Sequence, residues 1–178
     1  STFSGCSALQ NVIIPDAVTS IGPSAFSGCT VLTEITIPAG VTDISSSAFS
    51  NSVKKLTFAE GMTAIPDNAC YSASLLKEVA IPDTVTSIGS SAFRNCSQLA
   101  SIVLPNDLEE INSYAFYNCS ALVDVVIPDS LTSIGSSAFY GCTALASITI
   151  PGSVATIGTS AFYNCTSLSS VVLQEGIV

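Results

Sequence analysis

A unit of 23 residues recurs along the whole chain, and it restricts the fold more than any other feature. An Ala-Phe pair marks each unit, and successive pairs lie 23 residues apart, except for a spacing of 21 between Ala48 and Ala69. The complete pairs are Ala25-Phe26, Ala48-Phe49, Ala92-Phe93, Ala115-Phe116, Ala138-Phe139 and Ala161-Phe162. A fixed period of roughly 20–50 residues is the signature of stacked structural units that share one core with their neighbours.

Three further sets of positions keep the register of the Ala-Phe pair. A Cys lies three residues after the Phe at Cys6, Cys29, Cys96, Cys119, Cys142 and Cys165. An apolar-x-apolar segment follows, and a Pro closes it at Pro15, Pro38, Pro82, Pro105, Pro128 and Pro151. A Val/Leu-x-x-Ile segment completes the unit, as at 41–44 and 131–134.

Each part of the unit predicts a local structure. The apolar-x-apolar segment alternates with period two, which predicts a short strand with one buried face, and Pro ends it because it cannot donate to a ladder. The Val/Leu-x-x-Ile segment predicts a second extended segment. The Ser-Ser-Ala-Phe-x-Asn/Gly-Cys segment predicts one short helical turn. We expect its left-handed cap at the Gly or Asn before each Cys, namely Gly5, Gly28, Asn95, Asn118, Gly141 and Asn164.

The segment Leu-Thr-Glu-Ile-Thr-Ile-Pro at 32–38, continued by Val-Thr-Asp-Ile at 41–44 and Ser-Ala-Phe at 47–49, resembles the BspA-like leucine-rich repeats. The resemblance covers essentially the whole chain. It implies a right-handed leucine-rich-repeat solenoid, mainly β, with short parallel strands lining one face. It also implies a secreted or cell-surface protein that takes part in adhesion and protein binding, without identifying a ligand.

We expect residues 1–178 to form a single solenoid of about 7–8 repeats. Neither end carries the polar repeat that shields a solenoid core, so we expect the chain to be a fragment of a longer one. One irregularity interrupts the stack: the third unit loses two residues near 51–53 and lacks the Cys, and the next has Cys70 at the Phe position and Ala73 at the Cys position. These units predict a local kink or a narrower coil, through a functional bend or through drift in a tolerant repeat.

Composition excludes several classes of function. The formal net charge is -9, from four Lys/Arg and 13 Asp/Glu, so the chain lacks the basic footprint that nucleic acid requires. There is no His, which excludes a His-based triad and a His metal site. Apolar runs are too short for a membrane span. No phosphate loop, metal motif or nucleophile elbow is present, so we expect no enzyme and no cofactor.

The cysteines and three Asn-x-Ser/Thr sequons each have a structural interpretation. Neighbouring Cys positions should lie roughly 5 Å apart, within disulfide range, but their apolar setting favours buried free thiols. Asn95, Asn118 and Asn164 could carry glycans in a eukaryotic secretory pathway. Gly28 and Gly141 stand at the same repeat position, which indicates that the backbone angle selected Asn there.

Candidate partner-binding residues lie between the buried positions of the strands. A basic spot comprises Lys54, Lys55 and Lys77 beside Glu78, and it could steer an acidic partner. Farther along the chain, the equivalent exposed positions of the strands are mostly small or apolar, which is typical of a partner or self-association surface. These candidates are Val103, Val123, Asp124, Val126, Thr149 and Val172. An undecorated solenoid face is the alternative.

The sequence therefore predicts a non-enzymatic protein-recognition module of an extracellular or cell-surface protein, which binds through the exposed strand face. A structural subunit held permanently in a larger assembly is the alternative. Self-association could use the open solenoid ends or the apolar strip.

Overall fold

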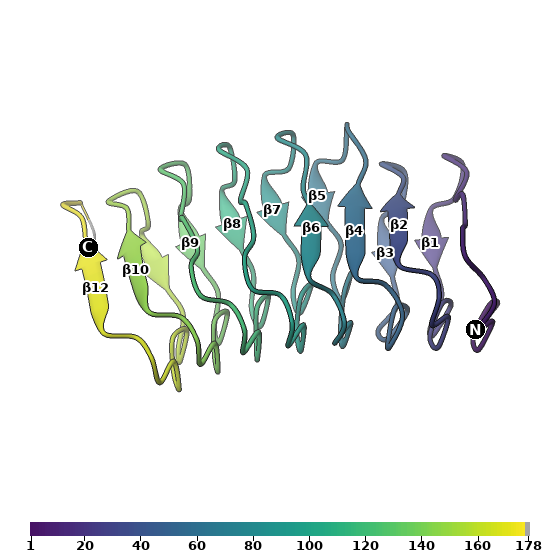
Figure 1. Ribbon diagram of the computed structural model, residues 1–178. Coiled ribbons are helices and arrows are strands. Elements are labelled where there is room, and N and C mark those ends of the chain that lie inside the picture. The colour runs from purple at the N-terminus through teal and green to yellow at the C-terminus, as the bar shows by residue number, and fades with distance from the viewer. Residues whose placement is uncertain (177–178) are drawn as a thin grey trace.

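The computed structural model describes residues 1–176 as a continuous stack of flattened coils, about 7 turns in all, and the strands within each sheet are parallel. Figure 1 shows the coils side by side from the N-terminus to the C-terminus, with one set of strands in front and a second set running the opposite way behind it. The apolar side chains lie between these two sets of strands. The predicted leucine-rich-repeat solenoid is confirmed.

The front set, which we call the strand face, contains the apolar-x-apolar segments. Its strands are β2 (Glu34–Ile37), β4 (Lys55–Phe58), β6 (Glu78–Ala80), β10 (Ser147–Ile150) and β12 (Ser170–Leu173). Alternate residues point into the core, as in the exposed-buried-exposed-buried pattern of β2. β2, β4 and β6 form one sheet, and β10 pairs with β12. Each strand ends within two residues of the repeat's Pro position, and in β2, β6 and β10 the residue there is a Pro, which has no amide to donate.

The rear set, which we call the second sheet, contains the predicted second extended segments. Its strands have two residues each: β1 (Ser20–Ile21), β3 (Asp43–Ile44), β5 (Ala64–Ile65), β7 (Ser87–Ile88), β8 (Glu110–Ile111), β9 (Ser133–Ile134) and β11 (Thr156–Ile157). The Ile of every strand from β1 to β9 is buried. The five strands from β5 to β11 pair in register without interruption.

The turn edge joins the second sheet to the strand face, and here the prediction of a short helical turn is wrong. Residues 1–176 contain no helix, and none of their segments has the length and apolarity of a membrane-spanning helix. Amide donors alternate instead: Cys96 N bonds Phe93 O within the coil, whereas Asn95 N bonds Tyr117 O of the next coil. A helix needs i to i−4 bonds along one coil, so this alternation replaces it with consecutive tight turns.

Two residues in each coil have a positive φ, and these left-handed positions produce the alternation of hydrogen bonds within a coil and between coils. The predicted one precedes the Cys and is confirmed, for example at Asn118 (φ 56) and Gly141 (φ 71). The second precedes the Ala-Phe pair and is usually a Ser: Ser24, Ser47, Asn68, Ser91, Tyr114, Ser137 and Ser160. Ser is a weak sequence signal for positive φ, which explains why the helical interpretation failed.

The core consists of ladders in which each repeat position stacks on its copy in the next coil. The Phe rings form two runs, Phe3–Phe26–Phe49 and Phe93–Phe116–Phe139–Phe162, with centroids 5.1–5.8 Å apart. Cys70 occupies the Phe position between the runs and is also buried. One unit could not bury this surface alone, so the stack is the unit of stability.

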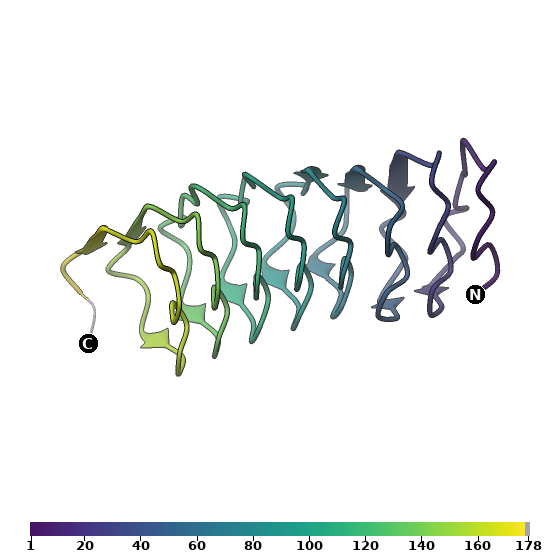
Figure 2. The ribbon, with the colours of Figure 1, turned by 60° about the horizontal axis from the view of Figure 1, so that its bottom comes forward.

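The second sheet is interrupted at the shortened unit, where the sequence predicts an irregular coil. Within residues 1–176 the second sheet is divided between β3 and β5, while β2 and β4 on the strand face remain paired. In regular coils the residue after the Ile donates its amide hydrogen to the carbonyl oxygen of the equivalent Ile in the preceding coil. Gly89 donates to Ile65 O in this way, and Ser45 donates to Ile21 O. Pro66 stands at that position and has no amide hydrogen. Figure 2 shows the wider separation of the coils here, so the irregular units of the sequence coincide with the break in the second sheet.

Candidate functional site

The basic spot lies at the N-terminal half of the strand face, where all four of its predicted residues are exposed. Lys54 and Lys77 are neighbours in one row, since Lys77 N donates to Lys54 O at 2.8 Å. Lys55 belongs to the adjacent row and pairs in register with Glu34 on one side and Glu78 on the other. Glu34 and Glu78 therefore flank Lys55 in its row, whereas Lys54 and Lys77 are two adjacent basic residues in theirs.

The predicted apolar strip also exists on the strand face. Val103 and Val126 are 82% and 76% exposed, and together with Pro128 they line a shallow hollow of about 220 Å³. Thr149 and Val172 continue the row, because they are in-register partners on β10 and β12. Val123 and Asp124 lie in two other rows: Val123 N donates to Ala100 O, and Asp124 bridges Ser101. The structure thus brings Val103, Val126, Thr149 and Val172 together as one row.

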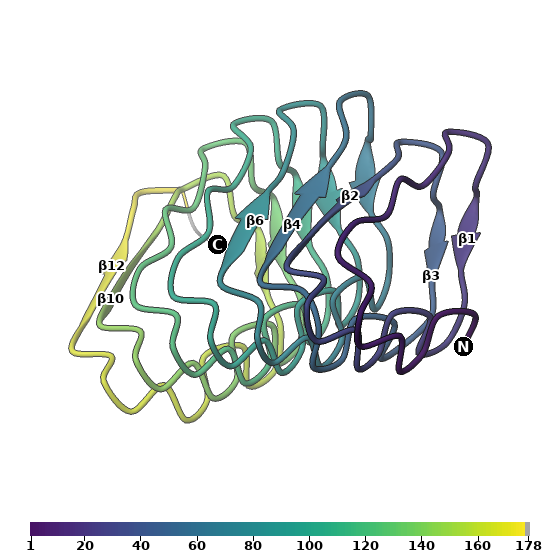
Figure 3. The same ribbon diagram turned by 45° about the vertical axis from the view of Figure 1, so that its right-hand side comes forward.

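The backbone beneath the apolar strip lacks regular sheet pairing. Among the residues that the structure describes, segments 101–104 and 124–127 share only the isolated bridge between Ser101 and Asp124. The second sheet remains paired behind them, through β7, β8 and β9. In Figure 3 the strand face accordingly carries arrows at β2, β4, β6, β10 and β12 but not between β6 and β10. The strip therefore combines exposed methyl groups with backbone polar groups that have no sheet partner.

The cysteines form an inert ladder inside the turn edge. All seven are free thiols, and only Cys6 is exposed. The Cys119 Sγ donates to Phe93 O at 3.1 Å, and Cys142, Cys165 and Cys29 make the equivalent bond one coil back. Burial raises the pKa of the Cys96 and Cys119 thiols well above the usual value, and raises that of Cys142 to about 12. Because the thiolate is the reactive form, these groups serve as packing and not as nucleophiles.

A ladder of tyrosines on the turn edge was missed by the sequence reasoning. The residue after the Phe is Tyr71, Arg94, Tyr117, Tyr140 and Tyr163 in successive coils. Rings 117, 140 and 163 stack with centroids 4.7 and 5.2 Å apart. The Arg94 guanidinium lies 4.6 Å from the Tyr117 ring centroid and 5.7 Å from that of Tyr71. Their 23-residue spacing was a visible signal, but this position is Ser in the first three units.

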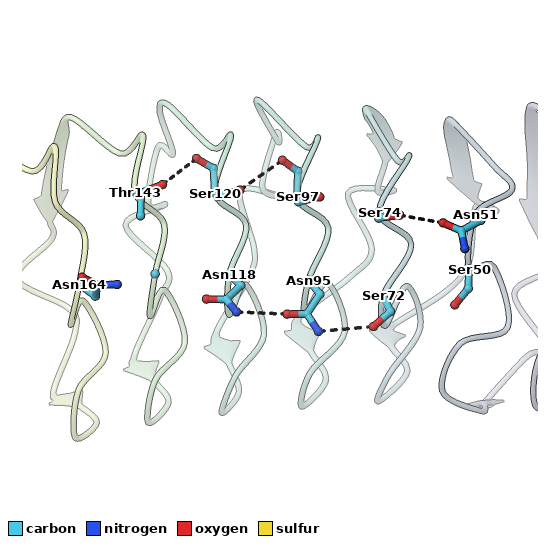
Figure 4. Close-up of a pocket in the computed structure, with 11 residues that line it drawn as sticks. Ser50, Asn51, Ser72, Ser74, Asn95, Ser97, Asn118, Ser120, Thr143 and Asn164 are labelled. Carbon is cyan, nitrogen blue, oxygen red and sulfur yellow. Dashed lines mark hydrogen bonds between the residues drawn. The ribbon is translucent and has the colours of Figure 1, made fainter.

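A polar groove, also missed, runs along the turn edge over at least five coils and has a volume of about 610 Å³. Figure 4 shows its two walls, one from the residues before the Cys and one from the residues after it. The first wall is Asn51, Ser72, Asn95, Asn118, Gly141 and Asn164, and the second includes Ser74, Ser97, Ser120 and Thr143. Every lining residue is neutral. Three Asn residues expected only to satisfy the backbone therefore also present their amides to a groove.

Within residues 1–176 no group of three or more His, Cys, Asp or Glu side chains is arranged to hold a metal ion. The candidate surfaces offer hydrogen-bonding groups, methyl groups and isolated charges. Such surfaces can recognise a partner, and the described geometry shows no coupled nucleophile and base.

Parallel strands on one face, a second sheet behind them and a 23-residue ladder of Ile, Leu, Phe and Cys define a leucine-rich-repeat solenoid. The family model described as "BspA type Leucine rich repeat region (6 copies)" matches residues 1–122 and 63–178. The chain therefore belongs to the BspA-type leucine-rich repeat family, and the resemblance inferred from the repeat is confirmed.

Solved structures agree with this assignment. The leucine-rich repeat protein TpLRR of T. pallidum is 30% identical, with a TM-score of 0.72 over 78% of this chain and 68% of that protein. A leucine-rich repeat protein of Bacteroides ovatus is 34% identical, with a TM-score of 0.72 over 97% of this chain and 51% of its own. The pneumococcal vaccine antigen PcpA (22% identity, TM-score 0.62, 92% and 50% covered) shares the fold. This chain thus spans about half the length of the last two. No functionally curated protein matches the sequence.

Proposed function

We propose that the chain is a non-enzymatic protein-recognition module of a secreted or cell-surface protein, and that its strand face is the binding surface. The row of Val103, Val126, Thr149 and Val172 carries this proposal. Two Val side chains more than three-quarters exposed, above backbone that lacks sheet partners, favour a protein partner that covers methyl groups and supplies hydrogen bonds. The family to which the chain belongs supports a surface location.

The basic spot gives this partner a further property. Lys54 and Lys77 are a local positive feature on a chain of net charge -9, so they favour an acidic region on the partner and speed its approach. Binding that depends on them should weaken as salt screens the charges, within a Debye length of about 8 Å at physiological ionic strength.

The test compares Val126→Lys with Thr42→Lys, a substitution of the same charge at an exposed position before β3 on the opposite face. A protein captured by the immobilised chain from surface extracts or a displayed protein library should bind Val126→Lys at least tenfold more weakly and Thr42→Lys unchanged. Equal affinity of Val126→Lys and the unmodified chain would remove the strip from the binding surface. Circular dichroism spectra of both variants control for the fold.

The alternative function, a structural subunit held permanently in a larger assembly, predicts a different behaviour of the purified chain. It requires association through the same strip, so sedimentation should show oligomers that Val126→Lys dissociates. A monodisperse monomer at all concentrations would contradict this alternative and favour the function as a recognition module.

A further inference from the structure

The amide ladder on the first wall of the polar groove is interrupted at Gly141. Asn95 Nδ2 donates to Ser72 Oγ at 3.4 Å, and Asn118 Nδ2 donates to Asn95 Oδ1 at 3.3 Å, so each coil donates to the coil before it. Gly141 has no side chain to continue the series, and Asn164 follows one coil later. Asn118 and Asn164 are both exposed and face the groove.

The interruption leaves an acceptor and a donor turned toward each other. Because Asn118 uses its Nδ2 on Asn95, its Oδ1 is directed away from Asn95, toward the coil of Gly141. Figure 4 shows this oxygen and the nitrogen of Asn164 pointing toward one another across that coil. Coils two steps apart are separated by about 10 Å of backbone, as twice the strand spacing requires. The two groups therefore face a gap of about one amide in length.

We propose that this gap is a binding site for the acetamido group of an N-acetylated amino sugar, whose amide completes the interrupted ladder. In a trans secondary amide the N–H and C=O point in opposite directions. The ligand N–H donates to Asn118 Oδ1, while its carbonyl oxygen accepts from Asn164 Nδ2. A single hydroxyl group is too short to reach both. Gly141 keeps this space open, because a Cβ at position 141 would displace the Asn118 amide from it.

The rest of the groove fits a neutral sugar chain. The second wall presents the hydroxyl groups of Ser120 and Thr143; Thr143 Oγ1 donates to Ser120 O at 3.3 Å and keeps its lone pairs for sugar hydroxyls. The absence of charge among the lining residues disfavours a charged ligand. An extended peptide advances about 3.3 Å per residue, against a coil spacing of about 4.8 Å, so its amides would leave register with the groove. A pyranose unit in a linear glycan is close to one coil in length.

The test uses di- and tri-N-acetylchitooligosaccharides, with the corresponding glucose oligosaccharides as probes that lack the acetamido group. The chain is produced in bacteria, so that Asn118 and Asn164 are free of glycans. Titration is followed by the side-chain amide signals of Asn118 and Asn164 in ¹⁵N–¹H NMR spectra. We expect these signals to shift with the acetylated sugars, and the glucose oligosaccharides to bind roughly tenfold more weakly, as the loss of two hydrogen bonds implies.

Two variants close or dismantle the site without straining the backbone. Gly141→Asn closes the gap, because its Cβ displaces the flexible Asn118 amide and its own amide takes the place of the ligand. Asn suits the positive φ of 71° there, since Asn95 and Asn118 adopt similar angles. Asn164→Gly removes the donor at φ 61°. Both should weaken binding about tenfold. Asn51→Gly is the matched control at the same repeat position (φ 54°) near the far end of the groove, and it should bind normally.

Three results would overturn the proposal: no shift at Asn118 and Asn164, equal binding of the acetylated and glucose oligosaccharides, or undiminished binding by Gly141→Asn. Triglycine binding as tightly as the acetylated trisaccharide would also overturn it, in favour of a peptide ligand. Because the groove and the strand face are separate, Val126→Lys should bind the sugars normally. Failure of one site therefore does not imply failure of the other.

Discussion

Phe116→Ala tests whether the stacked Phe ladder holds the coils together. Phe116 is fully buried, and its ring stacks on Phe93 at 5.3 Å and on Phe139 at 5.1 Å. Truncation of a buried Phe costs about 3–5 kcal/mol through lost transfer energy and the cavity that remains. Each stacked pair contributes about 0.5–1.5 kcal/mol beyond area burial, and two pairs are lost. We therefore expect a loss at the upper end of the range, about 5 kcal/mol.

Phe3→Ala is the matched control, because it removes the same side chain from the same repeat position. Phe3 is 41% exposed and stacks only on Phe26, at 5.6 Å. Its loss should cost about 1–2 kcal/mol. Urea unfolding followed by far-UV circular dichroism measures both, and hydrogen exchange should show the Phe116→Ala loss spreading to the adjacent coils. Equal costs for the two variants, or less than about 1 kcal/mol for Phe116→Ala, would refute the assignment of the ladder to the core.

The buried thiols, the break in the second sheet and Arg94 allow further tests. Because burial raises the pKa of the Cys96 and Cys119 thiols well above 9.0, Ellman's reagent at pH 8 should label Cys6 rapidly and the buried thiols only after unfolding; rapid labelling of several native thiols would contradict this. Above pH 9 the unfolded chain loses thiol protons that the folded chain keeps, so the free energy of unfolding should fall as pH rises toward 12. The Thr63 amide should exchange faster than that of Thr86, which donates to Thr63 O, and equal protection would mean that the second sheet is not open between β3 and β5. Arg94→Ala should cost about 0.5–2 kcal/mol and change the near-UV tyrosine signal, whereas an unchanged signal would separate Arg94 from the ladder.

The framework of this fold could be predicted because its residues have one role in every coil. Ile, Leu, Phe and Cys recur where the core is, so the 23-residue spacing alone located both strand sets and the buried thiols. The place where the second sheet is interrupted was also predictable as an irregularity, since the missing residues near 51–53 shorten one coil. Pro66 was not recognised as its second cause, because the amide that it lacks is needed only by the neighbouring coil.

The turn edge was harder to predict for a physical reason. Ser-Ala-Phe has ordinary helical propensity, and only the surrounding bonds between coils hold Ser91 or Ser137 at positive φ. Tertiary context thus decided the backbone conformation there. The Tyr ladder and the polar groove were missed for another reason: the Tyr position is Ser in the first three units, and the Asn residues before the Cys were interpreted only as backbone caps. On the strand face, by contrast, alternation alone placed the candidate residues outside.

A periodic stack gives equivalent residues the same neighbours, so a specific site requires an interruption of a ladder. Three interruptions carry the distinctive features of this chain. Pro66 and the shortened unit open the second sheet, and the unpaired segments around Val103 and Val126 expose methyl groups and backbone together. Gly141 interrupts the row of amides between Asn118 and Asn164. Because each interruption is a local change in an otherwise intact ladder, a single substitution that restores the ladder, such as Gly141→Asn, should weaken binding at the site while preserving the fold.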